Sequence, residues 1–208
     1  AGNALDLDYH LALTSPRDTT RDYILNHAME AFAMKNTSSE DVVIVYLSSH
    51  GTLTNEQLTV IRDGVKVVEP RKVPYVLTSD AREGRVPDSA IALHKLLDWF
   101  ERLPSSRKVL ILDMCHSGIA GKSQLSPEQA SLLKSAKGVN YVPLEDSSAA
   151  IVLASCPMGS SSFEDDGLQN SVYTHYLLKG MTAGDMNADG AVTISEAHNY
   201  AIDKTRAY

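Results

Sequence analysis

Three runs of apolar residues, rich in Val, Ile and Leu, divide the chain. They lie in residues 41–47, 108–113 and 149–154. A run of this kind, without polar residues at alternate positions, indicates a strand that is buried on both faces, as is typical of a parallel sheet. The sequence therefore predicts three central, fully buried strands.

Between these runs, the pattern predicts helices and shorter strands. Alternation of apolar and polar residues predicts a strand at residues 9–13, and the polar segment 52–74 predicts a small hairpin that leads into a short strand at 73–77. Apolar residues at helical spacing predict four helices. They are a helix capped by Asp18 or Thr19 and ended by residues 36–39, and helices at residues 87–103, 172–181 and 198–208.

Strands that alternate with helices predict an α/β fold of three layers, in which a mostly parallel central sheet is flanked by helices. Three residues with reactive side chains, His50, Cys115 and Cys156, each follow one of the buried strands. The carboxyl ends of parallel strands meet at one edge of a sheet, and ligands bind there in folds of this class. We therefore expect the three residues to share that edge, whatever the strand order.

The length of 208 residues suits a single domain that spans residues 1–208. Residues 119–148, between the second and third strands, are poor in β-branched residues and rich in Ser, Lys and Gln. This composition predicts a long, mobile linker.

Composition and charge narrow the range of functions. The chain is 43% hydrophobic and carries a formal net charge of −7, which argues against nucleic acid as a partner because phosphate binding needs a basic face. No apolar run approaches the roughly 20 residues that span a bilayer, and no signal-peptide pattern opens the chain. The chain begins without Met, which leaves open the removal of an upstream segment. Two cysteines indicate free thiols in a reduced, cytoplasmic compartment.

His50 and Cys115 are suited to thiol chemistry. A cysteine attacks a carbonyl as its thiolate, and a neighbouring imidazole promotes that ionisation. The backbone N–H groups near Gly51 and Cys115 are candidate donors to the resulting oxyanion. Taken singly, a Cys after a strand is more often a small buried hydrophobe, and a His before Gly is more often a turn residue. No Gly-rich phosphate loop follows a strand, which disfavours a nucleotide-binding fold.

Two segments resemble the paired signatures of the caspase–metacaspase superfamily, especially its bacterial and metacaspase-like members: Ser48-Ser49-His50-Gly51 and Asp113-Met114-Cys115-His116-Ser117-Gly118. The similarity extends to residues 75–81, 151–156 and 171–196. It implies the caspase-hemoglobinase-like fold and a cysteine endopeptidase with Cys115 as nucleophile, His50 as base and no cofactor in the chemistry. His116 then has a structural role.

Asp113 lies two residues before Cys115, so a strand would place both side chains on one face. A carboxylate beside the catalytic thiolate needs a cationic partner, and a substrate Arg or Lys would supply one, with Arg able to pair bidentately. Metacaspases resemble this sequence at Asp113 and cut after Arg or Lys, which predicts a peptide substrate with a basic P1 residue. Ser48 resembles another residue of that pocket, and Asp80 is a weaker candidate. The alternatives are that Asp113 only caps the following turn, or that cleavage follows Asp.

The resemblance also implies that the linker is cut during maturation. With a basic P1 preference, the lysines of the linker become candidates for self-cleavage. They are Lys122, Lys134 and Lys137.

A segment near the C-terminal end matches the spacing of an EF-hand calcium loop, with Gly190 at the turn position. The candidate ligands are Asp185, Asn187, Asp189, Thr193 and Glu196. The segment is therefore a candidate Ca²⁺ site, and the alternative is that the same turn serves only to connect two helices. Further acids at positions 164–166 could add negative potential near the pocket.

One unit of the superfamily has no counterpart in the sequence, namely a strand and helix that precede residues 9–13. The chain is then a fragment, a separate chain or segment completes the sheet, or residues 5–13 take that place. Two other functions remain open. One is a catalytically weak interaction or regulatory module, although the intact His–Cys pair argues against it. The other is a Ca²⁺-binding module on a caspase-like scaffold.

Overall fold

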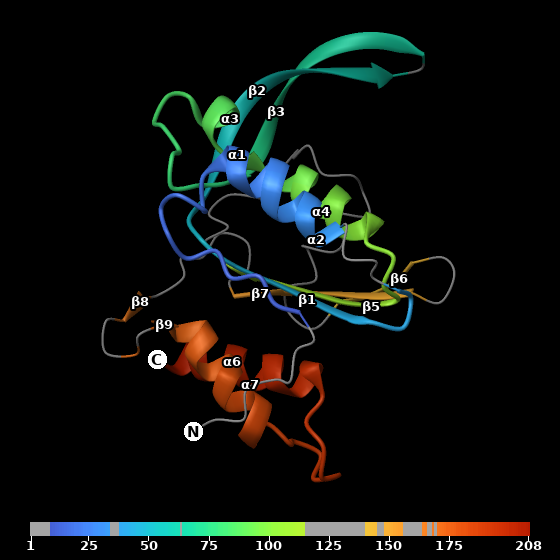
Figure 1. The fold of residues 1–208 in the computed structure, drawn as a ribbon, viewed down its shortest axis with the longest axis vertical. Helices are drawn as coiled ribbons and strands as arrows, with labels where there is room; N and C mark the ends of the chain where they lie inside the picture. Colours follow the sequence, from blue (N-terminus) through green and yellow to red (C-terminus); the bar gives the residue numbers. More distant parts are fainter. Residues whose placement is uncertain are drawn as a thin grey trace.

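In this computed structural model of the chain, helices cover both faces of a central sheet and a hairpin projects from one end (Figure 1). The structure describes residues 9–33, 38–62, 64–114, 140–144, 148–155, 164–165, 168 and 170–208. All statements below concern these residues.

The central sheet has four strands in the order β1-β5-β7-β6. The strands are β1 (Val42–Ser48), β5 (Arg107–Asp113), β6 (Asn140–Leu144) and β7 (Ser148–Ala154). Strands β1, β5 and β7 are parallel to one another, whereas β6 pairs antiparallel with β7. The predicted mostly parallel sheet, flanked by helices, is therefore confirmed.

One face of this sheet packs against an N-terminal helix and against α4 (Leu93–Arg102). The N-terminal helix comprises three consecutive segments with a π-helical middle: α1 (Arg21–Tyr23), η1 (Ile24–Ala28) and α2 (Met29–Ala33). The indole N–H of Trp99 donates to the carbonyl oxygen of Met29 at 3.2 Å and joins the two helices. The core on this face contains Val43, Leu93, Leu97, Phe100, Leu110, Leu112 and Val152.

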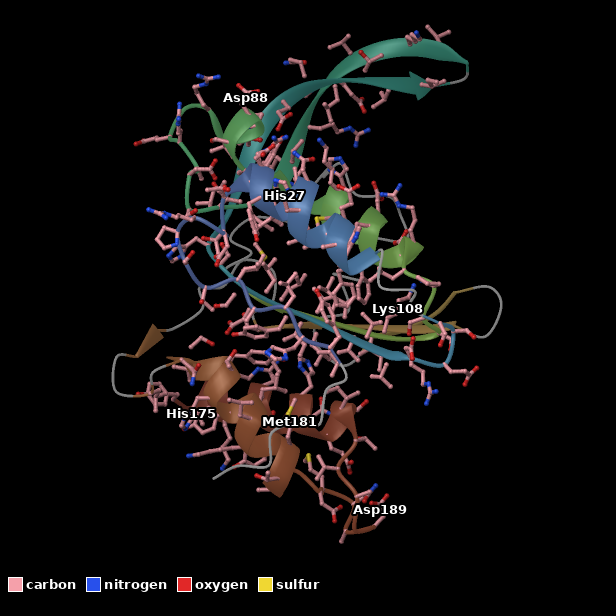
Figure 2. The ribbon with its side chains drawn as sticks, in the orientation of Figure 1. His27, Asp88, Lys108, His175, Met181 and Asp189 are labelled. Carbon is pink, nitrogen blue, oxygen red and sulfur yellow. The ribbon has the colours of Figure 1, made fainter. Side chains whose placement is uncertain are left out.

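Lys108 is buried at the amino end of β5, beside the end of α4 (Figure 2). Its ammonium group donates to the carbonyl oxygens of Glu101 and Leu103, each at 2.8 Å. The last carbonyls of a helix have no partner within the helix. Lys108 satisfies two carbonyls in this region, and burial lowers its pKa.

The opposite face packs against a pair of helices, α6 (Val172–Ala183) and α7 (Ile194–Ala207) (Figure 1). Gly180 lets them approach closely, because a Cβ at this position would lie 2.6 Å from the carbonyl oxygen of Ala197. The core on this face contains Ile111, Ile151, Leu153, Tyr173, Leu177, Ala197, Ala201 and Ile202.

β1 departs from the expectation of a strand buried on both faces. Val43 is buried, but Val42 is 61% exposed and Ile44 and Tyr46 are also exposed. β1 is an edge strand, and the core under α6 and α7 is formed with β5 and β7, so one face of β1 stays open. The hypothesis that a further strand completes the sheet remains a prediction, and this open edge is where such a strand would pair.

The segment predicted as a small hairpin forms a long one. β2 (Gly51–Arg62) and β3 (Val65–Val76) pair antiparallel along their full length, and β3 includes most of the short strand predicted at residues 73–77. The helix predicted at residues 87–103 is wrong at residues 90–92, which divide it into two helices. There, α3 (Val86–Ser89) gives way to β4 (Ile91–Ala92), because Ile91 and Ala92 pair with the end of β3 before α4 begins.

The N-terminal strand predicted at residues 9–13 is also wrong, since residues 9–14 form no helix or strand. The ring of Tyr9 packs on Phe32 instead. The first helix begins at Arg21, with Thr20 rather than Asp18 or Thr19 as its N-cap. Of the predicted linker 119–148, residues 140–144 form β6, and residues 119–139 and 145–147 lie outside the described residues.

A buried polar pair joins α6 to α7. The Tyr173 hydroxyl oxygen and His198 Nδ1 lie 2.9 Å apart, and both residues are almost fully buried. The burial of His198 lowers its pKa to about 4. The imidazole is therefore neutral in the folded protein at neutral pH.

Acidification is expected to destabilise the fold through His198. Between its ordinary pKa of 6.5 and the folded value of about 4, only the unfolded chain binds the proton, so stability falls as the pH falls through this window. Below about pH 4 both states are protonated and this loss is complete. We expect urea unfolding to show a loss of about 2–3 kcal/mol from this residue between about pH 7.5 and 4.5. A His198→Gln variant should lose that much less over the same range, and equal losses would contradict the assignment.

Candidate functional site

The carboxyl ends of three parallel strands form one edge of the central sheet. Ser48 lies opposite Asp113 in the pairing of β1 with β5, and Leu112 lies opposite Ala154 in the pairing of β5 with β7. Beyond the strands, the backbone N–H of Ser49 donates to the carbonyl of Asp113 at 3.2 Å. The residues after β1, β5 and β7 therefore leave the sheet at the same edge, as the sequence predicted.

His50 lies where the chain passes from the central sheet to the second sheet. Its carbonyl oxygen accepts a hydrogen bond from the backbone N–H of Leu77 at 2.9 Å. The hydroxyl of Ser49 donates to the carbonyl of Leu77 at 2.6 Å, and Gly51 opens β2 opposite Val76. These bonds fix the backbone on both sides of His50, which is itself exposed. Cys115 and Cys156 lie outside the described residues.

Asp113 is the buried acid of this edge, with 3% of its surface exposed. Its side chain faces α6, because Ile111, two residues earlier on β5, packs in the core beneath α6 and α7. Its carboxylate oxygen Oδ2 accepts hydrogen bonds from three hydroxyl groups. The donors are Tyr46, Ser171 and Thr174.

Two of these hydroxyls come from the N-terminus of α6. Ser171 is the N-cap of α6, and its Oγ accepts from the backbone N–H of Thr174 at 3.0 Å while its hydroxyl donates to Asp113. The N-terminus of a helix carries a partial positive charge. The hydroxyl donors and this dipole together offset part of the cost of burying the Asp113 carboxylate.

The third hydroxyl, that of Tyr46, comes from β1. Its oxygen lies 2.9 Å from Thr174 Oγ1 and 3.3 Å from Asp113 Oδ2, so the three side chains form one network. Burial raises the pKa of Tyr46, and the charge of Asp113 raises it further. Tyr46 therefore keeps its proton at neutral pH and can act as a donor.

The other carboxylate oxygen of Asp113 has no partner among the described residues. Oδ1 is buried and accepts no hydrogen bond, and within the described ranges no basic side chain forms an ion pair with Asp113. Ser155 Oγ, after the end of β7 on the same edge, is buried as well and has no partner in the described part of the chain. A buried acceptor without a donor costs about 1–3 kcal/mol, and more when it is charged. Among the described residues, this edge therefore supplies no hydrogen-bond donor to Asp113 Oδ1.

Of the other two predicted pocket residues, Ser48 lies next to Asp113, whereas Asp80 bonds to residues near the start of α1. Ser48 is the neighbour of Asp113 across the β1–β5 pairing. Asp80 accepts from the backbone N–H of Arg21 and from the Thr78 hydroxyl, each at 2.8 Å. Asp80 thus serves the start of α1, and no hydrogen bond joins it to Asp113 in the described part of the chain.

Glu164 and Asp165, two acids of the predicted segment 164–166, are linked to the same edge by strand pairing. β8 (Glu164–Asp165) pairs antiparallel with β9 (Asn170–Ser171), and Ser171 in turn donates to Asp113. Asp166, His116 and the candidate cleavage sites Lys122, Lys134 and Lys137 lie outside the described residues.

Sequence reasoning missed the three hydroxyl residues around Asp113. A signal existed for Tyr46, because the alternation of a strand places it on the same side as Ser48. Ser171 directly precedes the predicted helix at residues 172–181, which is the position of an N-cap. Nothing in the sequence indicated that this helix begins beside β5, since that contact depends on the tertiary fold.

The Asp-rich loop connects α6 to α7 at the end of the helix pair that lies away from the sheet (Figure 2, Asp189). The two carboxylate oxygens of Asp185 accept from the backbone N–H groups of Asp189 and Gly190, and Gly190 has a φ of 87°. Thr193 and Glu196 form a capping box at the start of α7. Among the residues that the structure describes, no group of three or more His, Cys, Asp or Glu side chains could hold a metal ion. Ca²⁺ binding stays a prediction of the sequence.

An open groove lies on the other face of the sheet, between the N-terminal helix and α4. It is lined by Leu25, Met29, Glu30, Lys95, Asp98, Trp99 and Arg102. These residues belong to the side opposite Asp113, so we do not assign the groove to the chemistry of this edge. In the described parts of the chain, none of the helices has the length and apolar character that crossing a membrane requires.

The protein has an α/β fold, and its candidate site lies at the carboxyl ends of parallel strands, where ligands bind in folds of this class. A histidine follows one of these strands, and a cysteine comes two residues after the buried acid that ends the next. The sequence model of the caspase domain family, a family of cysteine peptidases, matches residues 5–201, and the chain therefore belongs to this family. Among curated proteins, none matches the chain.

Proposed function

We propose that this chain is a cysteine endopeptidase that cuts peptide bonds after Arg or Lys, with Cys115 as the nucleophile and His50 as the base. Membership of the caspase domain family supports a peptidase. The observation that carries the basic specificity is Asp113, a buried carboxylate whose Oδ1 has no partner in the described part of the chain.

The proposed reaction has two stages. His50 takes the proton of the Cys115 thiol, and the thiolate attacks the carbonyl carbon of the scissile bond. The backbone N–H groups of Gly51 and Cys115 stabilise the oxyanion, and His50 returns the proton to the leaving amine as the peptide bond breaks. Water, deprotonated by His50, then attacks the thioester. The new carboxylic acid leaves, and the proton returns to the thiol.

The charge of Asp113 favours a cation in the pocket over an anion. A buried carboxylate is stabilised by an opposite charge within about 4–6 Å and is destabilised by a like charge at that distance. A P1 Asp would place a second carboxylate beside Oδ1, with no basic residue in the described ranges to separate them. Cleavage after Asp is therefore the less favoured alternative.

A panel of fluorogenic peptides with Arg, Lys, Asp or Ala at P1 tests this proposal, with Cys115→Ala as the matched control. Cleavage after Arg or Lys that disappears in the variant supports the proposal. Cleavage only after Asp keeps the nucleophile but removes the role given to Asp113. The absence of cleavage in the whole panel favours the alternative of an interaction or regulatory module.

Self-processing follows from the same specificity. We expect the wild-type chain to be cut after Lys122, Lys134 or Lys137 during incubation, because these lysines lie in the connection between β5 and β7. Intact-mass measurement before and after incubation, beside Cys115→Ala, reports the cut. A wild-type mass that incubation leaves unchanged, as it leaves that of Cys115→Ala, would contradict the expectation.

A further inference from the structure

We propose that Ser49 is a positioning residue of the proposed reaction, whose hydroxyl holds the backbone of His50 where its imidazole can take the proton of Cys115. This inference rests on the proposed function, in which His50 is the base. It concerns the short connection between the two sheets, because only Ser49 and His50 lie between the end of β1 and the start of β2.

Both residues of this connection are tied to the chain just beyond β3. The Ser49 hydroxyl donates to the carbonyl oxygen of Leu77 at 2.6 Å, and the backbone N–H of Leu77 donates to the carbonyl oxygen of His50 at 2.9 Å. The hydroxyl also lies 3.3 Å from the carbonyl oxygen of His50, but its single proton has the nearer acceptor in Leu77. These bonds bracket the backbone of His50 on both sides.

A third bond joins the connection to the central sheet. The backbone N–H of Ser49 donates to the carbonyl oxygen of Asp113 at 3.2 Å. Ser49 therefore links the end of β5 to the chain after β3, with His50 as the next residue. Of the three bonds, the one made by the hydroxyl is the shortest. It is also the one that a substitution can remove, since the other two are made by the backbone.

The imidazole of His50 depends on this backbone for its position. The base that activates a nucleophile is commonly oriented by a third group that bonds to it. His50 is exposed, and within the described ranges no residue holds its imidazole by a hydrogen bond. The backbone of His50 then sets the direction of its side chain. Because a misplacement of about 1 Å can lower a rate by about 100-fold, the bonds that fix this backbone affect the reaction.

Ser79 provides a matched control for the loss of such a bond. Its hydroxyl donates to the carbonyl oxygen of Pro16, also at 2.6 Å, from a position two residues beyond Leu77. Ser79→Ala and Ser49→Ala therefore remove the same type of bond from the same segment. They differ in that only the bond of Ser49 bears on His50.

The experiment combines two measurements on the full chain. The first gives kcat and KM for a fluorogenic peptide with Arg at P1. The second follows the alkylation of Cys115 by iodoacetamide over a range of pH, with peptide mapping by mass spectrometry to separate it from the other cysteine. The thiolate displaces iodide in this reaction, so the rate follows the fraction of thiolate and needs no peptide substrate. The variants are Ser49→Ala, Ser49→Thr, Ser79→Ala and His50→Ala.

We expect Ser49→Ala to lower kcat by about 10- to 100-fold and to change KM by less than about threefold, because it misplaces the base without altering the substrate pocket. The midpoint of the alkylation profile should move to higher pH, toward that of His50→Ala, since a displaced imidazolium stabilises the thiolate less. Ser49→Thr keeps the hydroxyl and should restore most of kcat. Ser79→Ala should match the wild type in both measurements.

Three results would overturn the inference while His50 remains the base. They are a Ser49→Ala protein with the wild-type kcat and alkylation profile, a Ser49→Thr protein as slow as Ser49→Ala, and a Ser79→Ala protein as slow as either. The last two would show that packing of the connection, and not the hydroxyl, is what matters.

The alkylation of Cys115 separates these results from a failure of the proposed function. If His50→Ala leaves the alkylation profile unchanged, the proposed base is wrong and the inference fails with it. If His50→Ala shifts the profile and Ser49→Ala does not, the His–Cys pair stands and only the role of Ser49 is wrong. Where the peptide is not cleaved, the alkylation profiles alone decide between these outcomes.

Discussion

Cys115→Ala is expected to lower kcat/KM for peptides with basic P1 residues by at least about 1,000-fold, because it removes the thiol that forms the thioester in the proposed mechanism. His50→Ala should cost a similar factor, since the thiol then has no base to take its proton. The two changes act on one step, so the double variant should be little worse than either single variant.

Cys156→Ala is the control for these variants. Cys156 is the other cysteine of the chain and follows β7 in the sequence, as Cys115 follows β5. If Cys115 is the nucleophile, Cys156→Ala should retain activity within about threefold, the range expected for a residue outside the reaction. Activity that survives Cys115→Ala but disappears in Cys156→Ala would show that the nucleophile had been assigned to the wrong strand.

The sequence was sufficient to predict the three central strands and their common edge. Long apolar runs are a strong signal for buried strands, and parallel pairing follows from the helices between them. The pattern predicted burial on both faces for β1, although Val42, Ile44 and Tyr46 are exposed. An apolar side chain indicates only that a residue can be buried. Whether a helix covers it depends on the position of the strand in the sheet.

The elements that the sequence misjudged are those where tertiary pairing overrides local preference. Ile91 and Ala92 fit a helical rhythm, yet they pair with Tyr75 and Val76 as β4. Residues 9–13 alternate like a strand, but in the structure they form none, and the ring of Tyr9 packs on Phe32. The network around Asp113 belongs to the same class, because it joins residues from β1, β5 and the start of α6 that are 58 to 67 positions apart from Asp113 in the chain.

The sequence identified Asp113 as a candidate pocket residue because it lies two residues before Cys115. The residues around its carboxylate determine which partner it can bind. A residue that only capped the following turn would direct its side chain to the backbone of that turn. In the described residues, Asp113 Oδ2 instead bonds to hydroxyls from β1 and α6, and Oδ1 bonds to nothing. The fixed orientation of Oδ2, and the lack of a donor to Oδ1 among the described residues, support the proposal that Asp113 binds a cationic P1 side chain.

Asp113→Asn is therefore expected to lower kcat/KM for both Arg and Lys substrates by about 100-fold or more, because loss of one partner of a buried charge pair costs about 2–5 kcal/mol. Asparagine has nearly the same shape, and its amide oxygen can still accept from the hydroxyls that hold Oδ2. Stability measured by urea unfolding should stay the same or rise, since the change removes a buried carboxylate that has no ion pair among the described residues.

The comparison of activity with stability separates specificity from structure. Asp203→Asn is the matched control, because this exposed acid on α7 has only a weak ion pair with Arg206, at 4.0 Å, and should change neither quantity. If Asp113→Asn destabilises the protein while cleavage after Arg and Lys continues at the wild-type rate, then Asp113 serves to anchor α6 to the sheet. A large loss of cleavage in a protein that unfolds at the same or higher urea concentration would instead assign the carboxylate to the P1 side chain, because only the charge has changed.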